Sequence, residues 1–154
     1  IARADVIACC GGGGLTSGIA LALEAEAPGL RARTAEPEGF DDAARSLAAG
    51  EITRNAALGG SICDAIVTPQ PGDLTFPILK RLCGPGLVVS DAEALQAIGH
   101  AFNRLKLVAE PGGAVALAAA LFRQDEIDGD DVIVTISGGN VDSDIFSRAL
   151  ATLD

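Results

Sequence analysis

The sequence has no tryptophan, tyrosine or methionine, and five phenylalanines supply its only aromatic side chains among 154 residues. Proteins that bind single-stranded nucleic acid stack bases on aromatic side chains, and a net charge of −10 repels a phosphate backbone. We therefore expect no nucleic-acid partner. The acidic excess also means that an anionic ligand needs a local group of donors, because the overall field is unfavourable.

Cysteine and histidine are scarce as well. The four cysteines, Cys9, Cys10, Cys63 and Cys83, have no paired C-x-x-C spacing, and His100 is the single histidine. This pattern argues against a disulfide framework and against a zinc site. Cys9 and Cys10 stand inside an apolar run, so we expect both to be small buried apolar side chains.

Long apolar segments are also missing. No uninterrupted apolar run approaches the roughly 20 residues that span a membrane, and no charged-then-apolar leader opens the chain. We expect no membrane partner and a cytoplasmic location. The chain opens on Ile1 and leads almost directly into a buried-looking strand, so we expect it to be the C-terminal part of a longer protein.

What the sequence does contain is an alternation of short apolar runs and helical patterns. This alternation is typical of an α/β fold, here one domain with a mostly parallel sheet flanked by helices. Ser90 and Glu93 have the spacing of a capping box. The expected strands cover residues 6–10, 30–35, 64–67, 87–89 and 131–136, and the expected helices cover 15–26, 41–49, 76–82, 91–105, 114–122 and the segment from 142.

The glycine run Gly11–Gly14 is the most informative stretch, because it joins an expected strand directly to an expected helix. Without Cβ atoms its backbone N–H groups can converge on an anion, and the helix start adds free N–H groups and a positive dipole end. This pattern favours a phosphate cradle. A dinucleotide-binding turn is an alternative, although Thr16 or Ser17 stands where the stricter G-x-G-x-x-G pattern needs glycine. A turn used only for close packing is another.

An acidic segment, Glu36-Pro37-Glu38-Gly39-Phe40-Asp41-Asp42, follows the second expected strand. Four carboxylates in seven residues repel one another unless water or a cation relieves them. Carboxylates and a backbone carbonyl form the oxygen set that Mg²⁺ or Ca²⁺ prefers. The alternative is a solvated loop and helix start that needs no metal.

The last expected strand ends at Ser137-Gly138-Gly139-Asn140, which would leave a hydroxyl exposed at the edge of the sheet. A nucleophilic serine needs a general base, and His100 lies in the middle of an expected helix. We therefore prefer a hydrogen-bonding serine to a hydrolase nucleophile. Glu110 precedes Pro111-Gly112-Gly113, where small residues allow close approach, and simple helix capping is the alternative.

Three of these loops, residues 11–14, 36–42 and 137–140, each follow an expected strand. The carboxyl ends of parallel strands meet at one edge of a sheet, which is where ligands bind in such folds. We expect the three loops to form one shared site.

Together these motifs resemble the fold-type II pyridoxal-phosphate (PLP) enzymes, and within them the threonine/serine dehydratase and serine racemase group. The segment 74–78 is similar to the one that follows the family's cofactor-side turn. The likeness spans nearly the whole chain and implies that residues 1–154 are the C-terminal part of the PLP-binding large domain, without its N-terminal lysine segment and without the small domain. The stretches that match in family order are 11–15, 36–43, 110–114 and 137–140.

The resemblance implies a role for individual residues. Ser137 would hydrogen-bond the pyridine nitrogen and Glu110 would lie near the cofactor. A neutral hydroxyl does not hold the ring nitrogen protonated, which suits β-elimination better than transamination. Backbone N–H groups would bind the cofactor phosphate at Gly11, Gly12, Gly13, Gly14 and Leu15, and a divalent cation such as Mg²⁺ would bind Glu36, the carbonyl of Phe40 and Asp42.

The chain departs from the family pattern at two places. Asp64-Ala65 stands where the family usually has Asp-Gly, and nothing matches the Ser-x-Lys-x-Arg-Gly motif of the catalytic lysine. Lys80 and Lys106 lie in other contexts. We therefore expect no catalytic residue in this chain, which alone would be inactive.

The expected activity is that of a larger enzyme, most simply a homo-oligomer, that contains this chain and a missing N-terminal segment. It would be a dehydratase that converts a 3-hydroxy amino acid such as L-threonine or L-serine into a 2-oxo acid and ammonia. A racemase or dehydratase acting on serine or hydroxyaspartate is an alternative. A non-catalytic domain that binds a phosphorylated metabolite or nucleotide is another.

Overall fold

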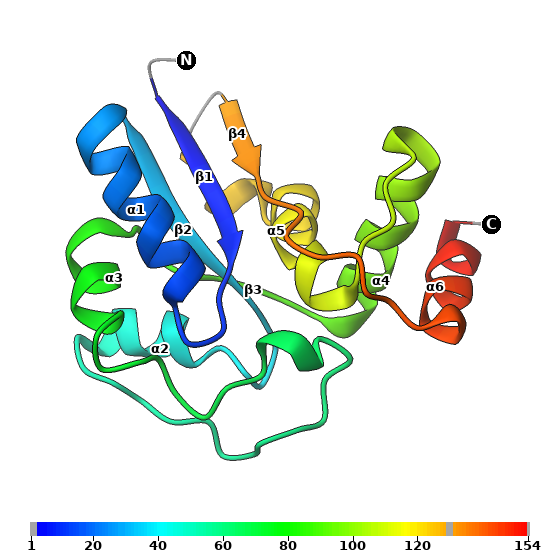
Figure 1. Cartoon of the computed structure of the whole chain (residues 1–154), viewed down its shortest axis with the longest axis horizontal. Coiled ribbons are helices and arrows are strands. Elements are labelled where there is room, and N and C mark those ends of the chain that lie inside the picture. Colours follow the sequence, from blue (N-terminus) through cyan, green and yellow to red (C-terminus); the bar gives the residue numbers. More distant parts are fainter. Residues whose placement is uncertain (1–2, 129–130, 154) are drawn as a thin grey trace.

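The computed structural model describes residues 3–128 and 131–153 and has a parallel four-stranded sheet at its centre. Residue Ile1, on which the expectation of a preceding segment rests, lies outside the described residues. The strand order is β3-β2-β1-β4 (Figure 1), and every pairing is parallel, where the sequence predicts a mostly parallel sheet. The strands are β1 (Ala4–Cys9), β2 (Leu30–Pro37), β3 (Leu87–Val89) and β4 (Asp131–Val134).

Strand β1 lies between β2 and β4 and is buried along its whole length. It pairs with β2 from Ala4 opposite Leu30 to Cys9 opposite Ala35. A strand covered on both faces is expected to be almost continuously apolar, and β1 is apolar except for Asp5. Cys9 and Cys10 are both buried, which confirms that expectation.

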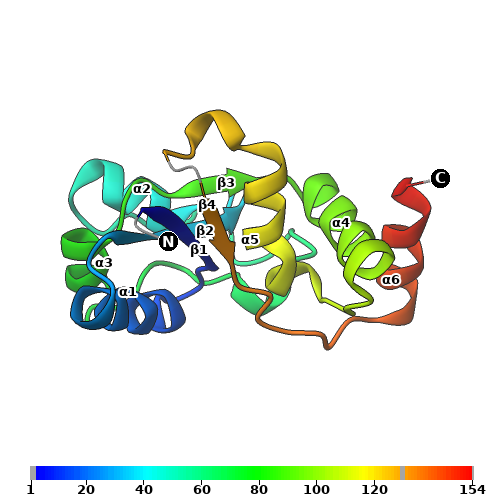
Figure 2. The same ribbon diagram turned by 90° about the horizontal axis from the view of Figure 1, so that it is seen from above.

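Helices cover both faces of the sheet. Figures 1 and 2 show α1, α2 and α3 on one side and α5 on the other, with α5 between the sheet and α4. Helix α5 contacts all four strands, and α6 packs on α4. The helices are α1 (Gly14–Glu26), α2 (Asp42–Ala49), α3 (Phe76–Leu82), α4 (Asp91–His100), α5 (Pro111–Phe122) and α6 (Ser143–Leu150), with short turns η1 (Asp64–Ile66), η2 (Ala101–Leu105), η3 (Gln124–Glu126) and η4 (Ala151–Leu153).

Helix α5 approaches the sheet closely because it is built from alanine and glycine. Its residues from Pro111 to Ala116 are all buried, and its alanines belong to the main hydrophobic core together with Ile7 and Leu87. Small side chains on the covering helix let the backbones come close while still removing apolar surface from water. No helix among the described residues combines the length and the hydropathy that crossing a membrane requires.

One expected strand is wrong. Asp64–Ile66 form the 3-10 turn η1 instead, and the N–H groups of Ile66 and of the following Val67 donate to the carbonyls of Cys63 and Asp64. The three apolar residues 65–67 match a strand pattern, but a strand needs a neighbour to pair with, and here the backbone hydrogen bonds are satisfied locally. Ile66 is buried beside Gly112 at the start of α5, which explains its apolar character.

Other differences concern where elements begin and end. Strand β4 ends at Val134 rather than at 136, and α5 begins at Pro111 rather than at 114. The expected helix 91–105 continues to its predicted end, but Ala101–Leu105 forms a π-helical turn. The predicted capping box is confirmed: Glu93 N–H donates to Ser90 Oγ at 3.2 Å, and Ser90 N–H donates to Glu93 Oε2 at 2.8 Å.

The amino end of the sheet contains an ion-pair network that the sequence pattern does not predict. Asp5 on β1 is buried and accepts hydrogen bonds from Arg31 and from the fully buried Arg33 on β2, at 2.9 and 3.1 Å. Burial alone would raise the pKa of Asp5, but these two guanidinium groups outweigh it and hold the pKa below its ordinary value. The network lies at the opposite end of the strands from the glycine run.

Candidate functional site

The glycine run connects the end of β1 to the start of α1, at the lower end of β1 in Figure 1. Gly13 precedes the helix with a φ of 91°, a conformation that side chains disfavour. A Cβ atom at Gly13 would also lie 2.8 Å from Thr75 Oγ1. The chain's own packing therefore requires glycine at position 13.

Gly12 and Gly14 differ from Gly13, because a Cβ atom added at either would meet no atom within 4 Å. Their φ angles are not in the left-handed region, so neither packing nor backbone conformation requires glycine there. Helix α1 also has no side-chain cap and no acidic residue in its first turn. Open space beside uncapped helix N–H groups fits an anion that approaches the backbone closely.

Neighbouring hydroxyl groups hold the glycine run in place. The Gly12 carbonyl accepts hydrogen bonds from Gly72 N–H at 3.0 Å and from the Thr75 hydroxyl. Thr16 Oγ1 donates to the Cys9 carbonyl at 2.9 Å, and Ser17 Oγ donates to the Thr75 carbonyl at 3.3 Å. Thr16 and Ser17, which break the dinucleotide-binding pattern, are thus buried residues that fix the loop.

The serine–glycine loop lies beside the end of β1 because β4 pairs with β1. Ser137 Oγ is 3.1 Å from Cys9 Sγ, and Ser137 N–H donates to the Gly113 carbonyl at 3.4 Å. Glu110 N–H donates to the Gly138 carbonyl at 3.0 Å, and a Cβ atom at Gly138 would overlap the Glu110 carboxylate. The structure thus brings Glu110 against the loop that carries Ser137.

The acidic segment has a different geometry from a solvated loop. Glu36, at the end of β2, is completely buried, and its two oxygens accept hydrogen bonds from Ala43 and Ala44 N–H at 2.8 and 2.7 Å. Glu36 therefore caps α2, while Asp41, which precedes the helix, makes no side-chain cap. Burial raises the pKa of Glu36 to about 8. The hydrogen bonds from the two helix N–H groups lower this pKa, whereas the nearby charges of Asp42 and Asp41 raise it further.

Asp42 is also buried, and burial raises its pKa above the ordinary value. Its Oδ1 accepts a hydrogen bond from Asn55 Nδ2 at 2.7 Å, but its Oδ2 is buried without a hydrogen-bond partner. An unpaired buried carboxylate oxygen is costly, and a cation bound there would relieve it. Within residues 3–128 and 131–153 no three His, Cys, Asp or Glu side chains form a metal-binding group, so a cation would also need carbonyl or water oxygens, such as the carbonyl of Phe40.

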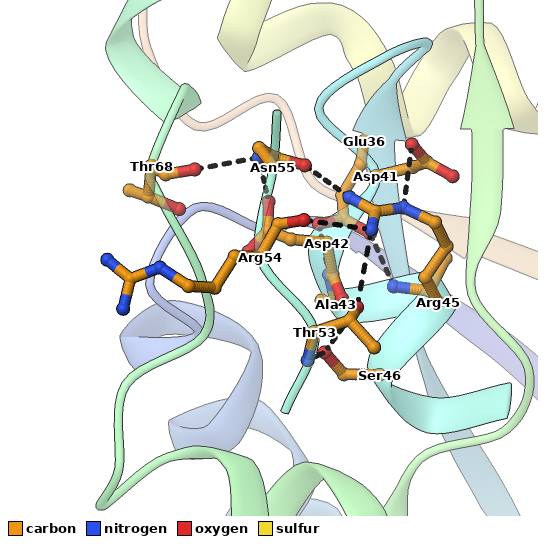
Figure 3. A network of polar contacts seen from close by, with 11 residues as sticks. Glu36, Asp41, Asp42, Ala43, Arg45, Ser46, Thr53, Arg54, Asn55 and Thr68 are labelled. Carbon is orange, nitrogen blue, oxygen red and sulfur yellow. Dashed lines mark hydrogen bonds and ion pairs between the residues drawn. The ribbon is translucent and has the colours of Figure 1, made fainter. Parts of the chain in front are cut away.

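Asn55 is a residue of this region that the sequence analysis misses. Figure 3 shows it between Thr68 and the acidic residues at the start of α2. Its Nδ2 also donates to the Thr68 carbonyl at 2.8 Å, and its Oδ1 accepts from Arg45. These partners lie 10 and 13 residues away along the chain, so no local pattern marks Asn55.

A cavity of about 430 Å³ opens beside Glu110, between η1 and the start of α5. The residues that line it include Asp64, Glu110, Asn140 and Asp142. The two lysines are held elsewhere: Lys80 Nζ donates to the Gly50 carbonyl at 2.7 Å, and Lys106 Nζ lies 5.6 Å from the Phe102 ring centre.

The glycine loop, the acidic segment and Ser137 all fall inside one known sequence pattern. The pattern that defines the pyridoxal-phosphate-dependent enzymes matches residues 2–139. The chain belongs to this family, and the resemblance stated from its motifs is confirmed at that level.

Two curated relatives are similar to nearly the whole of this chain. The chain is 38% identical over 148 residues to a serine racemase of Dictyostelium discoideum, covering 94% of this chain and 45% of the relative. It is 40% identical over 139 residues to a β-hydroxyaspartate dehydratase of Paracoccus denitrificans, covering 90% and 44%. The chain thus spans less than half the length of these relatives.

A solved structure has the same fold. A threonine deaminase from T.th. superposes with a TM-score of 0.85 at 40% identity, covering 91% of this chain and 51% of that one. This agreement confirms the α/β fold with a parallel sheet flanked by helices.

Proposed function

We propose that this chain is the C-terminal part of the cofactor-binding large domain of a PLP-dependent ammonia-lyase that acts on a 3-hydroxy amino acid. The observation that carries the proposal is the uncapped start of α1, where Cβ atoms at Gly12 and Gly14 would meet open space, while Cys9 just before the glycine run contacts Ser137. Family membership supports PLP as the ligand, because its phosphate is the anion that such a cradle fits.

Each residue of the proposed site has one task. Backbone N–H groups from Gly11 to Leu15 bind the cofactor phosphate, and Ser137 Oγ donates a hydrogen bond to the ring nitrogen. Glu110 lies beside the Ser137 loop and near the cofactor. When bound, PLP supplies an electron sink for negative charge at the substrate α-carbon. A neutral serine hydroxyl leaves the ring nitrogen unprotonated, which favours loss of the β-hydroxyl over transfer of the amino group.

The substrate class is supported by the relatives: a threonine deaminase and a β-hydroxyaspartate dehydratase both match at 40% identity. L-threonine and L-serine are the proposed substrates, and hydroxyaspartate is a further candidate. Racemisation is a second candidate function, favoured by the similarity to the Dictyostelium serine racemase. Chiral analysis of serine incubated with the enzyme separates the two reactions.

We also propose a divalent cation, such as Mg²⁺, bound by Glu36, the Phe40 carbonyl and Asp42. The unpartnered Oδ2 of Asp42 and the crowding of two buried carboxylates support it. The catalytic lysine would come from a segment outside this chain, and the complete enzyme would be a cytoplasmic homo-oligomer.

The test uses the complete enzyme that contains this chain. Absorbance measures the binding of PLP, and the release of a 2-oxo acid and ammonia measures turnover. Gly12→Ala places a methyl group in the cradle, so we expect PLP affinity to fall by about tenfold or more. Gly18→Ala is the matched control, because a Cβ atom at Gly18 also meets no atom within 4 Å but lies inside α1, away from its first residues. Equal PLP affinity in both variants would contradict the cradle, and nucleotide binding without PLP binding would favour a non-catalytic domain.

A further inference from the structure

The contact between Cys9 and Ser137 joins two segments that are 128 residues apart in the chain. Cys9, the last residue of β1, is only 6% exposed, and its Sγ lies 3.1 Å from Ser137 Oγ. The main chain of Ser137 is held separately, by its N–H bond to the Gly113 carbonyl. The thiol is the hydrogen-bond partner of the Ser137 hydroxyl among the residues that the structure describes.

A serine hydroxyl has one hydrogen, so the direction of this contact decides what Ser137 can offer to a ligand. If Ser137 donated to Cys9, its oxygen could only accept from the ligand. If Cys9 donates its S–H hydrogen to Ser137 Oγ, the hydroxyl hydrogen is free to point away from β1. Sulfur is a weak acceptor, whereas an unprotonated pyridine nitrogen is a good one, so the second arrangement forms the better pair of hydrogen bonds.

We propose that Cys9 is a positioning residue that orients the Ser137 hydroxyl as a donor toward the ring nitrogen of bound PLP. This inference rests on the proposed function and adds to it a side chain that does not touch the cofactor. Cys9 acts through Ser137 by removing the rotational freedom of the hydroxyl, and its burial keeps water from taking its place.

The experiment measures PLP affinity and the absorbance and fluorescence of bound PLP in the complete enzyme after the cofactor has been removed and titrated back. Cys9→Ala removes the donor, and one hydrogen bond corresponds to a weakening of about three- to tenfold in Kd. Cys9→Val removes the donor but fills the space, so it should weaken binding as Cys9→Ala does. Cys9→Ser restores a donor and should recover most of the affinity and the wild-type spectrum.

A double-mutant cycle separates orientation from packing, because residues that act through one contact are not additive. In a Ser137→Ala background, Cys9→Val should cause no further loss of PLP affinity. An equal loss in both backgrounds, or wild-type affinity and spectrum in Cys9→Val, would overturn the inference. If Cys9→Ala fails to fold, the comparison of Cys9→Val with Cys9→Ser decides the question.

The failure of this inference differs from a failure of the proposed function. A wild-type enzyme that does not bind PLP would refute the proposed function itself. A wild-type enzyme that binds PLP, with Cys9→Val indistinguishable from it, refutes only the role of Cys9.

Discussion

At the scale of single residues, Asp41 and Asp42 show how neighbouring carboxylates can differ completely. Asp41 is half-buried and pairs with Arg45 at 3.4 Å across one turn of α2. Asp42 is buried, and one of its oxygens has no hydrogen-bond partner. A partly exposed ion pair of this kind contributes little to stability, whereas an unpaired buried oxygen is a free-energy cost that a ligand can remove.

The proposed cation therefore has a thermodynamic consequence. A cation that binds only the folded state stabilises it by about 2.7 kcal/mol at 100 times its Kd, so Mg²⁺ should raise the melting temperature and EDTA should lower it. Asp42→Asn should abolish this shift, whereas Asp41→Asn, the matched control, should retain it. Differential scanning fluorimetry of the three proteins with Mg²⁺ and with EDTA measures the effect. The same Mg²⁺ shift in Asp42→Asn and in wild type would rule out this site.

At the scale of elements, the start of α5 positions the Ser137 loop through contact between backbones. A Cβ atom at Gly113 would lie 2.6 Å from the Gly138 carbonyl oxygen. At Gly112 it would make ordinary contact with Ile66, at 3.4 Å. Close packing therefore requires glycine at position 113 but not at position 112.

We expect alanine substitutions at these two positions to differ in sign. Gly112→Ala should be neutral or stabilise the protein by up to about 1 kcal/mol, because alanine is the better helix former. Gly113→Ala should destabilise it by about 1–3 kcal/mol, because the helix must move away from the Ser137 loop. Urea unfolding of both variants measures the difference, and equal midpoints would show that the close approach is not essential.

Glu93, in the first turn of α4, connects this helix to the end of α5. It accepts hydrogen bonds from Arg123 at 2.7 and 2.8 Å, and it also closes the capping box with Ser90. Burial alone would raise the pKa of Glu93, but the bonds from Arg123 and Ser90 outweigh it and hold the pKa below its ordinary value. A lowered carboxylate pKa contributes stability at neutral pH, and this contribution is lost as the pH falls through the folded-state pKa.

Glu93→Gln should therefore reduce stability by about 1–2 kcal/mol at pH 7, because it weakens the cap and the charged hydrogen bonds. The difference from wild type should shrink as the pH falls below the unfolded-state value of about 4.3. Urea unfolding of both proteins between pH 3 and pH 7 checks this expectation. A constant difference over the whole range would show that the Glu93 charge is not involved.

At the scale of the whole molecule, several large apolar side chains remain exposed, among them Leu58, Leu74 and Leu105. The chain also spans less than half the length of its curated relatives. Both observations fit the proposal that further protein is needed for activity.

We expect the isolated chain to release no 2-oxo acid from L-threonine, and co-expression with the remainder of the enzyme to restore release. Turnover by the isolated chain at the rate of the complete enzyme would show that a lysine within it suffices.

The sequence predicts the parallel sheet and most helices because apolar periodicity and glycine or proline boundaries are local signals. It also predicts that the loops after β1, β2 and β4 gather at one edge, because parallel strands end on the same side. It does not predict the Asp5–Arg33 pair or the Asn55 contacts, because their partners are distant in the chain. The error at 64–67 has the same origin, since the availability of a neighbouring strand is not a local property.

The pairing of β1 with β4 affects the proposed ligand site, although the paired residues themselves lie outside that site. The ladder has four pairs of partners, from Ala4–Asp131 to Ile7–Val134, and Thr135 N–H extends it by a bond of 3.1 Å to the Ile7 carbonyl. A slip of one residue in this pairing would move the chain that leads to Ser137 by about 3.3 Å along β1. The alignment of β4 with β1 therefore sets the distance between the proposed phosphate-binding glycines and the proposed ring-nitrogen partner Ser137.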